Sequence, residues 1–338
     1  MEVTNWGAGS KNSLEAKSMN FSSSIDTNAP LAIVAPSGRQ YGNAAPVFRQ
    51  STAVLPALLS NYLSMSATYS NNRAEKQLII GDPDSKESKI LYPTGEVLQG
   101  TLNYIFLFLD RNNNLYTWRT PKEHPEILPQ IHRDLLGTGF LTSGSRYQFR
   151  TLQEQVNFME KASQANLQSL MPVYADKFGI LSPFIQGTPY DQYLRSGGIK
   201  ATANVLDNII TAHNQNIVYG DRWTKNTIVK QDEPIVEIDF DIELIGANAQ
   251  EFEMAQLLYH ILFFSNRREE LLKFLKGYLH HERALVRHNL SVVKKFLCNY
   301  IDYFQDKSVE GISGGIKQEI AELIEMLSFK NYIAYASD

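Results

Sequence analysis

The stretch that decides the fold runs from residue 217 to residue 241 and reads IVYGDRWTKNTIVKQDEPIVEIDFD. Two short apolar runs within it have the pattern of strands, and each leads into an aspartate, Asp221 or Asp239. Asn226 lies between them, five residues after Asp221 and thirteen before Asp239. An amide and two carboxylates can offer hard oxygen ligands to Mg²⁺ while one carboxylate stays free to accept a proton. Such a set suits phosphoryl transfer, where catalysis rests mostly on positioning and charge neutralisation.

These residues resemble two motifs of the protein-kinase-like superfamily. Tyr219-Gly220-Asp221 through Asn226 resembles its catalytic loop, in the Gly-Asp form of aminoglycoside and lipopolysaccharide kinases. Ile238-Asp239-Phe240-Asp241 resembles its metal-binding Asp-Phe-Gly segment, in an Asp-Phe-Asp form. The resemblance covers roughly residues 89–265 and implies that Asp221 is the catalytic base and that Asn226 and Asp239 bind Mg²⁺. Two surface turns that hold acids by coincidence are the alternative.

Residues upstream extend the resemblance to a nucleotide site. Segment 95–104 resembles the loop that covers the nucleotide, with Gly100 as its one central glycine, although an ordinary β-turn would also explain it. The next strand ends in Arg119, where the family has its phosphate-binding lysine. Arginine keeps the charge but is not interchangeable with lysine, so Lys122 is a second candidate for that role, and a solvated strand-end cation is the alternative for Arg119.

Two further positions complete the expected nucleotide site. Glu154, on the first predicted helix, is the candidate to pair with the phosphate-binding cation, and a solvated helical glutamate is the alternative. Segment 181–187 resembles the hinge between the two lobes of a kinase. There backbone groups would meet the edge of the adenine of ATP, while apolar neighbours, with Phe184 and Ile185 as the candidates, would sandwich the ring. A plain strand-to-helix linker is the alternative.

Hydrophobic periodicity predicts a β-rich half followed by a larger helical half. Apolar runs at 104–109 and 115–118, separated by a polar turn, predict a β-hairpin. A strand at 89–92 is expected to end at Pro93. Two later strands are expected at 171–174 and 179–181. Apolar residues at helical spacing predict helices at 152–162, 199–214, 250–264, 268–278, 284–304 and 316–327.

We therefore expect an α+β protein with a bilobal, protein-kinase-like fold. Residues 1–52 are rich in Ser, Asn and Ala and are expected to be poorly ordered, because they bury too little apolar surface. Residues 53–186 would form a small β-rich N-lobe with a preceding short helix. Residues 187–338 would form a larger helical C-lobe that carries the catalytic loop.

Composition bounds the class of protein. The 338 residues are 43% hydrophobic and hold 32 Lys plus Arg against 36 Asp plus Glu, a net charge of −4 that excludes a globally basic nucleic-acid binder. The one cysteine, Cys298, excludes a disulfide framework. No apolar run has the length of a transmembrane helix, and no signal peptide is evident. We expect a soluble protein of a reducing compartment, cytoplasmic or delivered into a host cytosol as an effector.

A basic segment at 267–295 differs from the rest of the chain. It holds eight Lys or Arg and three Glu, which gives a local net charge of +5 in a chain of net −4. Lys273 and Lys276 share one face of a predicted helix, and Arg283 and Arg287 share one face of the next. If the two helices form a hairpin, these cations could bind a polyanion such as an inositol phosphate or an acidic lipid headgroup. A solvated hairpin is the alternative.

The resemblance implies a phosphotransferase that uses ATP and Mg²⁺, with a protein hydroxyl slightly favoured over a small molecule as the acceptor. A polar N-terminal segment and a divergent N-lobe suit an effector kinase, and few acids follow Asp241 to form the acidic cleft of an aminoglycoside kinase. A pseudokinase or nucleotide-binding scaffold is the rival, favoured by Arg119 and the single loop glycine. Transfer of a nucleotidyl group is a further alternative on the same fold.

Overall fold

The structure, a computed structural model, describes residues 33–34, 40–41, 78–80, 89–123, 125–231, 234–280, 288–305 and 313–336. Strands β1 (Ile33–Val34) and β2 (Gln40–Tyr41) pair with each other. Apart from these strands, the segment 1–52 and the short helix expected after it lie outside the described residues. Among the described residues, no helix combines the length and apolar character needed to cross a membrane.

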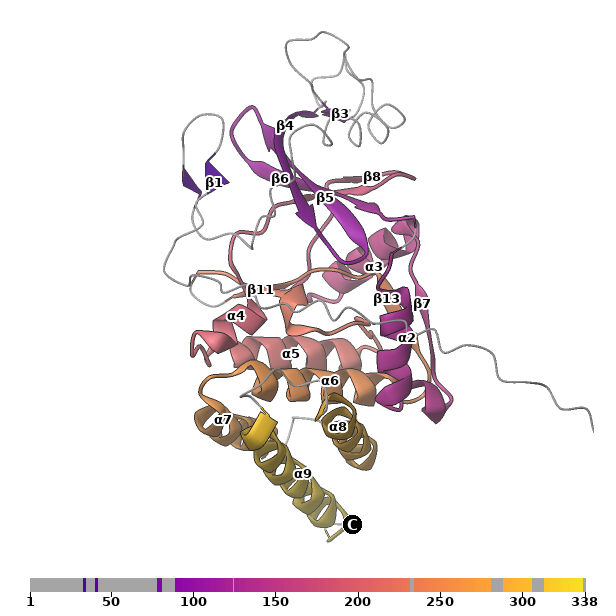
Figure 1. Ribbon diagram of the computed structural model, residues 1–338, viewed down its shortest axis with the longest axis vertical. Coiled ribbons are helices and arrows are strands. Elements are labelled where there is room, and N and C mark those ends of the chain that lie inside the picture. Colours follow the sequence, from indigo (N-terminus) through magenta and orange to yellow (C-terminus); the bar gives the residue numbers. More distant parts are fainter. Residues whose placement is uncertain are drawn as a thin grey trace, which may run out of the picture.

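A six-stranded antiparallel sheet forms the N-terminal part of the described chain (Figure 1). Its strands lie in the order β3-β4-β5-β6-β9-β8, with the bounds Leu78–Ile80, Lys89–Gln99, Asn103–Asp110, Leu115–Pro121, Ile180–Pro183 and Tyr174–Ala175. The long strands are rich in aromatic and β-branched residues, which fit a pleated surface. Phe106, Trp118 and Leu181 belong to the apolar cluster that stabilises the sheet.

The predicted hairpin is confirmed. β5 and β6 pair in register, with Phe106 opposite Trp118, and the Asp110 carboxylate accepts hydrogen bonds from two backbone N–H groups in the turn between them. The expected end of the preceding strand at Pro93 is wrong. β4 continues to Gln99 through a register shift between Pro93 and Val97, because a bulge accommodates a residue that has no N–H to donate.

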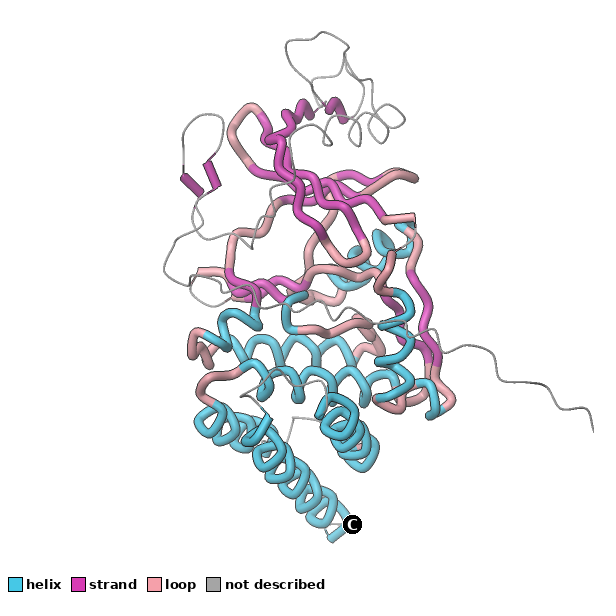
Figure 2. The backbone as a smooth tube through the Cα atoms, viewed as in Figure 1, coloured by secondary structure: helices cyan, strands magenta, loops and turns pink. Residues whose placement is uncertain are grey.

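The C-terminal part is helical, so strands gather in one half of the molecule and helices in the other (Figure 2). Its helices have the bounds α4 Tyr190–Arg195, α5 Ala201–Asn214, α6 Ala249–Phe264, α7 Arg268–His280, α8 Leu290–Gln305 and α9 Ser313–Ala336. α6 is buried along nearly its whole length and forms the centre of the helical core. The expected α+β organisation, a sheet-rich part followed by a helical part, is confirmed.

Most predicted helices agree with the structure to within a few residues at each end. The helix expected at 284–304 is described only from residue 288, and there α8 begins at Leu290. Asn289 precedes it and accepts a hydrogen bond from the backbone N–H of Ser291, which favours a helix start at this point.

Two helices lie between strands of the large sheet in the sequence. α3 (Leu152–Gln164) was predicted and packs with Met159 and Ala162 against Ile180. α2 (Leu128–Gly137) was not predicted. It lies beside the helical part, where the ring of Tyr303 on α8 packs so tightly on Gly137 that a Cβ there would be 2.1 Å from it.

Short strands between the two parts flank the motif residues. β10 (Thr188–Pro189), β11 (Thr227–Val229) and β12 (Ile235–Glu237) form one small sheet. β7 (Arg146–Phe149) and β13 (Ile242–Ile245) form another. The 3-10 helix η2 (Thr224–Asn226) leads directly into β11. Asn226 therefore stands at the start of one strand, while Asp239 follows the end of its neighbour.

Candidate active site

The structure brings Asn226 and Asp239 onto neighbouring segments. β11 and β12 are antiparallel, with Thr227 opposite Glu237, and the backbone N–H of Ile238 donates to the carbonyl of Asn226 at 2.8 Å. The Asn226 side chain in turn donates from Nδ2 to the backbone oxygen of Asp221 at 3.0 Å. The three residues expected to share one site therefore lie on two segments joined by direct hydrogen bonds.

The backbone at position 220, directly before the candidate base, requires a glycine. Its φ of +115° lies in a region that other residues rarely adopt. A Cβ at this position would lie 1.8 Å from the carbonyl oxygen of Ile242, so the chain at 220 and the chain at 242 can approach this closely only with glycine. The close approach places Asp221 beside the segment that carries Asp239.

A buried arginine that the sequence analysis missed fastens these segments together. The guanidinium of Arg150 donates from Nη1 to the carbonyl oxygens of Tyr219, Phe240 and Ile242, at 2.9, 3.1 and 2.8 Å. Arg150 is 8% exposed and its cation stands 4.3 Å from the ring centre of Phe158. Arg150 therefore acts as a structural clamp, and it gave no signal in the sequence because all of its guanidinium hydrogen bonds go to backbone oxygens.

Helix α6 supports the loop of Asp221 from the helical part. Glu253 accepts from the backbone N–H of Gly220 at 2.7 Å. Gln256 accepts from the backbone N–H of Arg222 at 2.9 Å and donates from Nε2 to Oδ1 of Asp221 at 3.2 Å. One oxygen of the Asp221 carboxylate is thus held in place by a side chain from a rigid helix.

Asp221 has the electrostatics of a general base. Burial raises its pKa to about 6, and the positive charges of Lys225 and Arg222 limit that rise. At neutral pH the carboxylate is ionised, yet its pKa is close enough to neutrality for it to take a proton from a reacting hydroxyl.

Asp239 is held in an unusual backbone conformation at the point where the two parts of the molecule meet. Its φ of +65° is left-handed, and Nη2 of Arg222 donates to its carbonyl oxygen at 3.1 Å. Its side chain remains 38% exposed, and Nη1 of Arg119 lies 3.2 Å from its Oδ1. The backbone strain is therefore offset by contacts that leave the carboxylate accessible.

Asp239 and Asp241 are neighbouring carboxyl groups whose pKa values are shifted in opposite directions. Burial raises the pKa of Asp241 to about 8, and the adjacent charge of Asp239 adds to that rise. For Asp239 the effect of burial is outweighed by the hydrogen bond from Asp241 and the charge of Arg119, so its pKa is lowered. Asp239 is therefore the more acidic carboxyl group of the two. Asp241 Oδ2 also accepts from Asn103 Nδ2 at 2.6 Å, which ties the β4–β5 turn to this segment.

The expected partner of Arg119 is wrong by one residue. Glu154 is at the third position of α3, where its carboxylate accepts from the backbone N–H of Thr151 at 2.7 Å and completes a capping box. Gln155, which is 2% exposed, instead accepts a hydrogen bond from Nη2 of Arg119. Because α3 starts at Leu152, the Glu154 side chain bends back to the N-terminal end of the helix, whereas the Gln155 side chain points into the protein.

A first cavity, of about 410 Å³, lies between the large sheet and the helical part. Four of the expected nucleotide-site residues line it: Gly100, Arg119, Phe184 and Ile185. Lys122 does not line it. Its ammonium donates to the carbonyl oxygen of Gly100 at 2.8 Å, so it stabilises the turn between β4 and β5.

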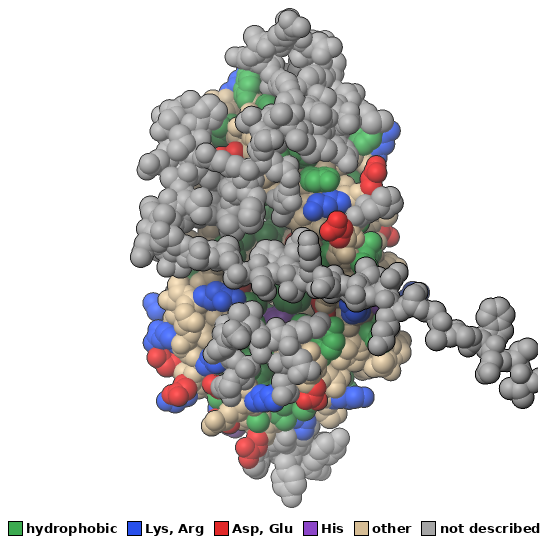
Figure 3. All heavy atoms as spheres, in the orientation of Figure 1, with side chains coloured by type: hydrophobic (Ala, Val, Ile, Leu, Met, Phe, Trp, Pro, Cys, Tyr) green, Lys and Arg blue, Asp and Glu red, His purple; other side chains and the backbone are tan. Residues whose placement is uncertain are grey.

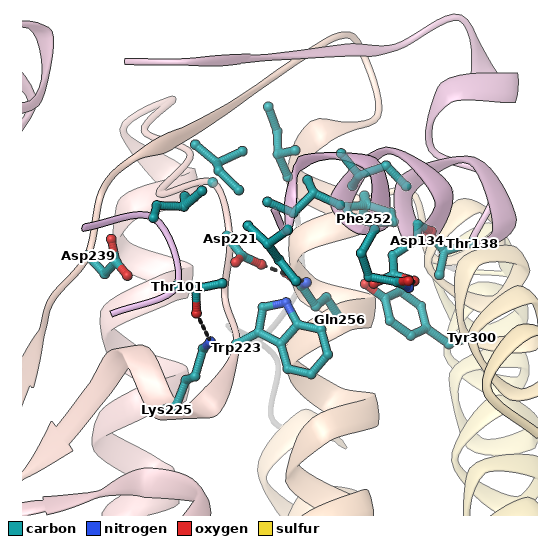
Figure 4. Close-up of a pocket in the computed structure, with 18 of the residues that line it drawn as sticks. Thr101, Asp134, Thr138, Asp221, Trp223, Lys225, Asp239, Phe252, Gln256 and Tyr300 are labelled. Carbon is teal, nitrogen blue, oxygen red and sulfur yellow. Dashed lines mark hydrogen bonds between the residues drawn. The ribbon is translucent and has the colours of Figure 1, made fainter. Parts of the chain in front are cut away.

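A second cavity, of about 280 Å³, adjoins the first and was not anticipated. Asp239 and Lys225 line both cavities, whereas Asp221 lines only the second. Figure 4 shows Asp239 at one end of this space, Asp221 and Trp223 in the middle, and Asp134 with Tyr300 at the other end. The wall supplied by α2 was missed because α2 itself was missed, although Leu128, Ile131 and Leu135 have helical spacing.

The basic segment is only partly described. Lys273 is exposed on α7, while Lys276 forms an ion pair with Glu322 of α9 at 2.6 Å. Arg283 and Arg287 lie outside the described residues, so the expected cluster of four cations stays a prediction. On the face drawn in Figure 3, basic and acidic side chains of the helical part are intermixed.

Comparisons with known proteins give little to add to this geometry. No family model matches the chain, and no curated protein matches it. Among solved structures, it is similar to the Rio2 kinase from Chaetomium thermophilum. The match has 11% sequence identity and a TM-score of 0.39, and it covers 69% of this chain and 84% of that one.

Proposed function

We propose that this chain has a protein-kinase-like fold and transfers a phosphoryl group from ATP, with Mg²⁺, to an acceptor hydroxyl. The observation that carries the proposal is the junction of the two cavities. They meet at Asp239 and Lys225, and Asp221 faces only the second. The first cavity would hold the phosphoryl donor and the second the acceptor, and the two are joined at the Asp239 carboxylate. With the candidate base on the acceptor side alone, this is the arrangement that in-line transfer requires.

The first cavity suits a nucleotide. Its walls include the apolar side chains of Ile105, Met159 and Leu170 beside the segment of Phe184 and Ile185, which can hold a flat base. Its lining also carries two cations, Arg119 and Lys225, and Arg119 pairs with Asp239 at the junction with the second cavity. The adenine would lie against the apolar side chains, so that its phosphates point to that junction.

Asn226 and Asp239 are the residues that would hold Mg²⁺. They offer hard oxygen donors from adjacent segments, and the Asp239 carboxylate is ionised and accessible. A bound Mg²⁺ would neutralise charge on the phosphate oxygens of ATP. The ion pair between Arg119 and Asp239 must then loosen, which frees the guanidinium to meet phosphate oxygens.

Asp221 would act on the acceptor. As the acceptor oxygen bonds to the γ-phosphorus, the bond from that phosphorus to the β–γ bridging oxygen breaks and ADP leaves. The hydroxyl proton passes to the Asp221 carboxylate, whose pKa of about 6 suits that step. Lys225, which donates to Thr101 Oγ1 at 3.5 Å, stands at the junction and can offset negative charge on the group in transfer.

A pseudokinase is the second candidate function. One observation favours it: Arg119 is already paired with Asp239 and Asp241, and its partner on α3 is the neutral Gln155. Such a site could hold a nucleotide without turning it over. Nucleotidyl transfer would use the same residues with a different bond broken. A protein acceptor of the effector type, which the sequence favoured, is compatible with the chemistry of Asp221.

One experiment separates these functions. The full chain is incubated with Mg²⁺ and either γ-labelled or α-labelled ATP, together with mixed protein and small-molecule acceptors. Phosphoryl transfer predicts label from γ-labelled ATP alone, and nucleotidyl transfer predicts label from α-labelled ATP. Asp239→Ala should abolish Mg²⁺-dependent ATP binding, while Glu160→Gln, an exposed acid on α3, should not change it. Unchanged ATP affinity in Asp239→Ala would refute the proposed site.

A further inference from the structure

The second cavity has an apolar lining away from its junction with the first. Ile131 and Leu135 of α2, Phe252 of α6, and Tyr300 and Phe304 of α8 line it. Trp223 closes one side, and its ring stacks on His260 with 4.4 Å between ring centres, which fixes its orientation. Such walls favour a ligand with an apolar or aromatic body, because burying its apolar surface against them is favourable.

The wall formed by α2 is fastened to the helical part. Tyr303 Oη donates to Asp134 Oδ1 at 2.9 Å, and Asn299 Nδ2 donates to the carbonyl oxygen of Thr138 at 3.0 Å. The tight packing of Tyr303 on Gly137 adds a third attachment. α2 therefore acts as a fixed side of the cavity, and Figure 4 shows its residues facing those of α6 and α8.

The size of the cavity also limits its ligand. Its volume of about 280 Å³ lies just below the usual range for small-molecule sites, which begins near 300 Å³. An acceptor peptide is normally held along an open groove or a sheet edge, with its main chain hydrogen-bonded. Here the described walls come from α2, α6, α8, the loop of Asp221, the β4–β5 turn and β13, and a space of this volume suits a compact ligand.

We infer that the acceptor is a compact small molecule that carries a hydroxyl group on an apolar body. The inference rests on the proposed phosphotransferase function and names its substrate class. The body lies among Ile131, Phe252 and Tyr300, and the hydroxyl points to Asp221. In that position the hydroxyl gives its proton to Asp221 as its oxygen bonds to the γ-phosphorus, and ADP leaves into the first cavity.

The test uses 2-phenylethanol as a probe of the full chain, because it combines an apolar ring with one hydroxyl. Ligand-observed NMR should show saturable binding with a Kd on the order of 1 mM, as expected for a ligand of this size. Ile131→Trp fills the cavity and should weaken binding by about tenfold or more. Leu136→Trp is the matched control on the same helix, because Leu136 is 47% exposed and does not line the cavity.

Gln130→Trp, at another lining position on α2, provides a second filling variant in case Ile131→Trp does not fold. A parallel assay offers γ-labelled ATP and a pool of Ser, Thr and Tyr peptides. Absence of probe binding, or binding unchanged in both filling variants, overturns the inference. Labelling of the peptide pool overturns it too. Failure of ATP and Mg²⁺ to bind refutes the proposed function instead, and it leaves the binding of the probe to be judged separately.

Discussion

The guanidinium of Arg119 lies 3.2 Å from the carboxylate of Asp239, so the cation expected to meet phosphate is paired with the acid expected to meet metal. Both side chains reach this point from separate parts of the chain, β6 and the segment after β12. The same guanidinium approaches Asp241 at 3.6 Å and donates to Gln155. Arg119 thus neutralises an acidic site, and under the proposed function the binding of Mg²⁺ and ATP would have to rearrange it.

Replacement of Arg119 by Ala should lower the affinity for Mg–ATP by about tenfold or more, the scale of one lost charged hydrogen bond. Lys122→Ala should have a smaller effect, because the Lys122 ammonium is bound to the carbonyl oxygen of Gly100 and does not line the first cavity. Titration calorimetry of both variants checks the ranking. A larger loss in Lys122→Ala would assign the phosphate-binding role to Lys122.

Asp221→Asn should leave ATP affinity nearly unchanged and reduce turnover by about 10²–10⁴, which is the usual contribution of a positioned base. Asparagine preserves the shape of the side chain but cannot take the proton. Gln256→Ala should give a smaller reduction in turnover, because it removes only the hydrogen bond that orients the Asp221 carboxylate. Wild-type turnover in Asp221→Asn would show that the base lies elsewhere.

The turnover of the wild-type protein should fall as the pH drops through about 6. Burial raises the pKa of Asp221 to that value, so the carboxylate loses its ability to accept a proton well above the ordinary range of aspartate near 4. Rates measured between pH 5 and pH 8 at saturating ATP should therefore reach a plateau above pH 7. A rate that stays flat to pH 4.5 would contradict the role assigned to this group.

Adjacent residues of α3 should behave differently when each is replaced by Ala. Gln155→Ala removes a partner of Arg119 and should weaken Mg–ATP binding. Glu154→Ala breaks the capping box with Thr151 and should slightly lower the melting temperature without a change in ATP affinity. Differential scanning calorimetry and ATP titration on the same samples distinguish the two effects. The reverse pattern would restore Glu154 as the partner of Arg119.

Whether the role of a residue can be predicted from sequence depends on where its interaction partners lie. The helices at 152–162, 199–214, 250–264 and 268–278 were predictable because apolar spacing reports a buried face, whereas α2 and α4 were missed. Asp221, Asn226 and Asp239 stood out because a few spacings define the motif. Arg150 was not predictable, since its guanidinium binds only backbone oxygens that the fold assembles. The partner of Arg119 was predicted one position too early, at Glu154 instead of Gln155, because the first residue of a helix decides which side chains face inward.

Gly220 offers the sharpest test of how the two motif segments are joined. Ala at this position would need a φ of +115° and would place its Cβ 1.8 Å from the Ile242 carbonyl oxygen. The backbone must then separate, and the hydrogen bonds from Arg150 that hold both segments must lengthen. We expect a loss of stability of more than about 2 kcal/mol, together with loss of Mg–ATP binding.

Gly277→Ala is the matched control. Gly277 lies inside α7, and a Cβ added there would meet no atom within 4 Å beyond the backbone of its own helix, so Ala should stabilise the protein by about 0.5–1 kcal/mol through helix propensity. Urea unfolding of both variants, with ATP titration of each, measures the contrast. If Gly220→Ala unfolds at the wild-type urea concentration and binds Mg–ATP normally, the close approach of residues 220 and 242 does not position the site.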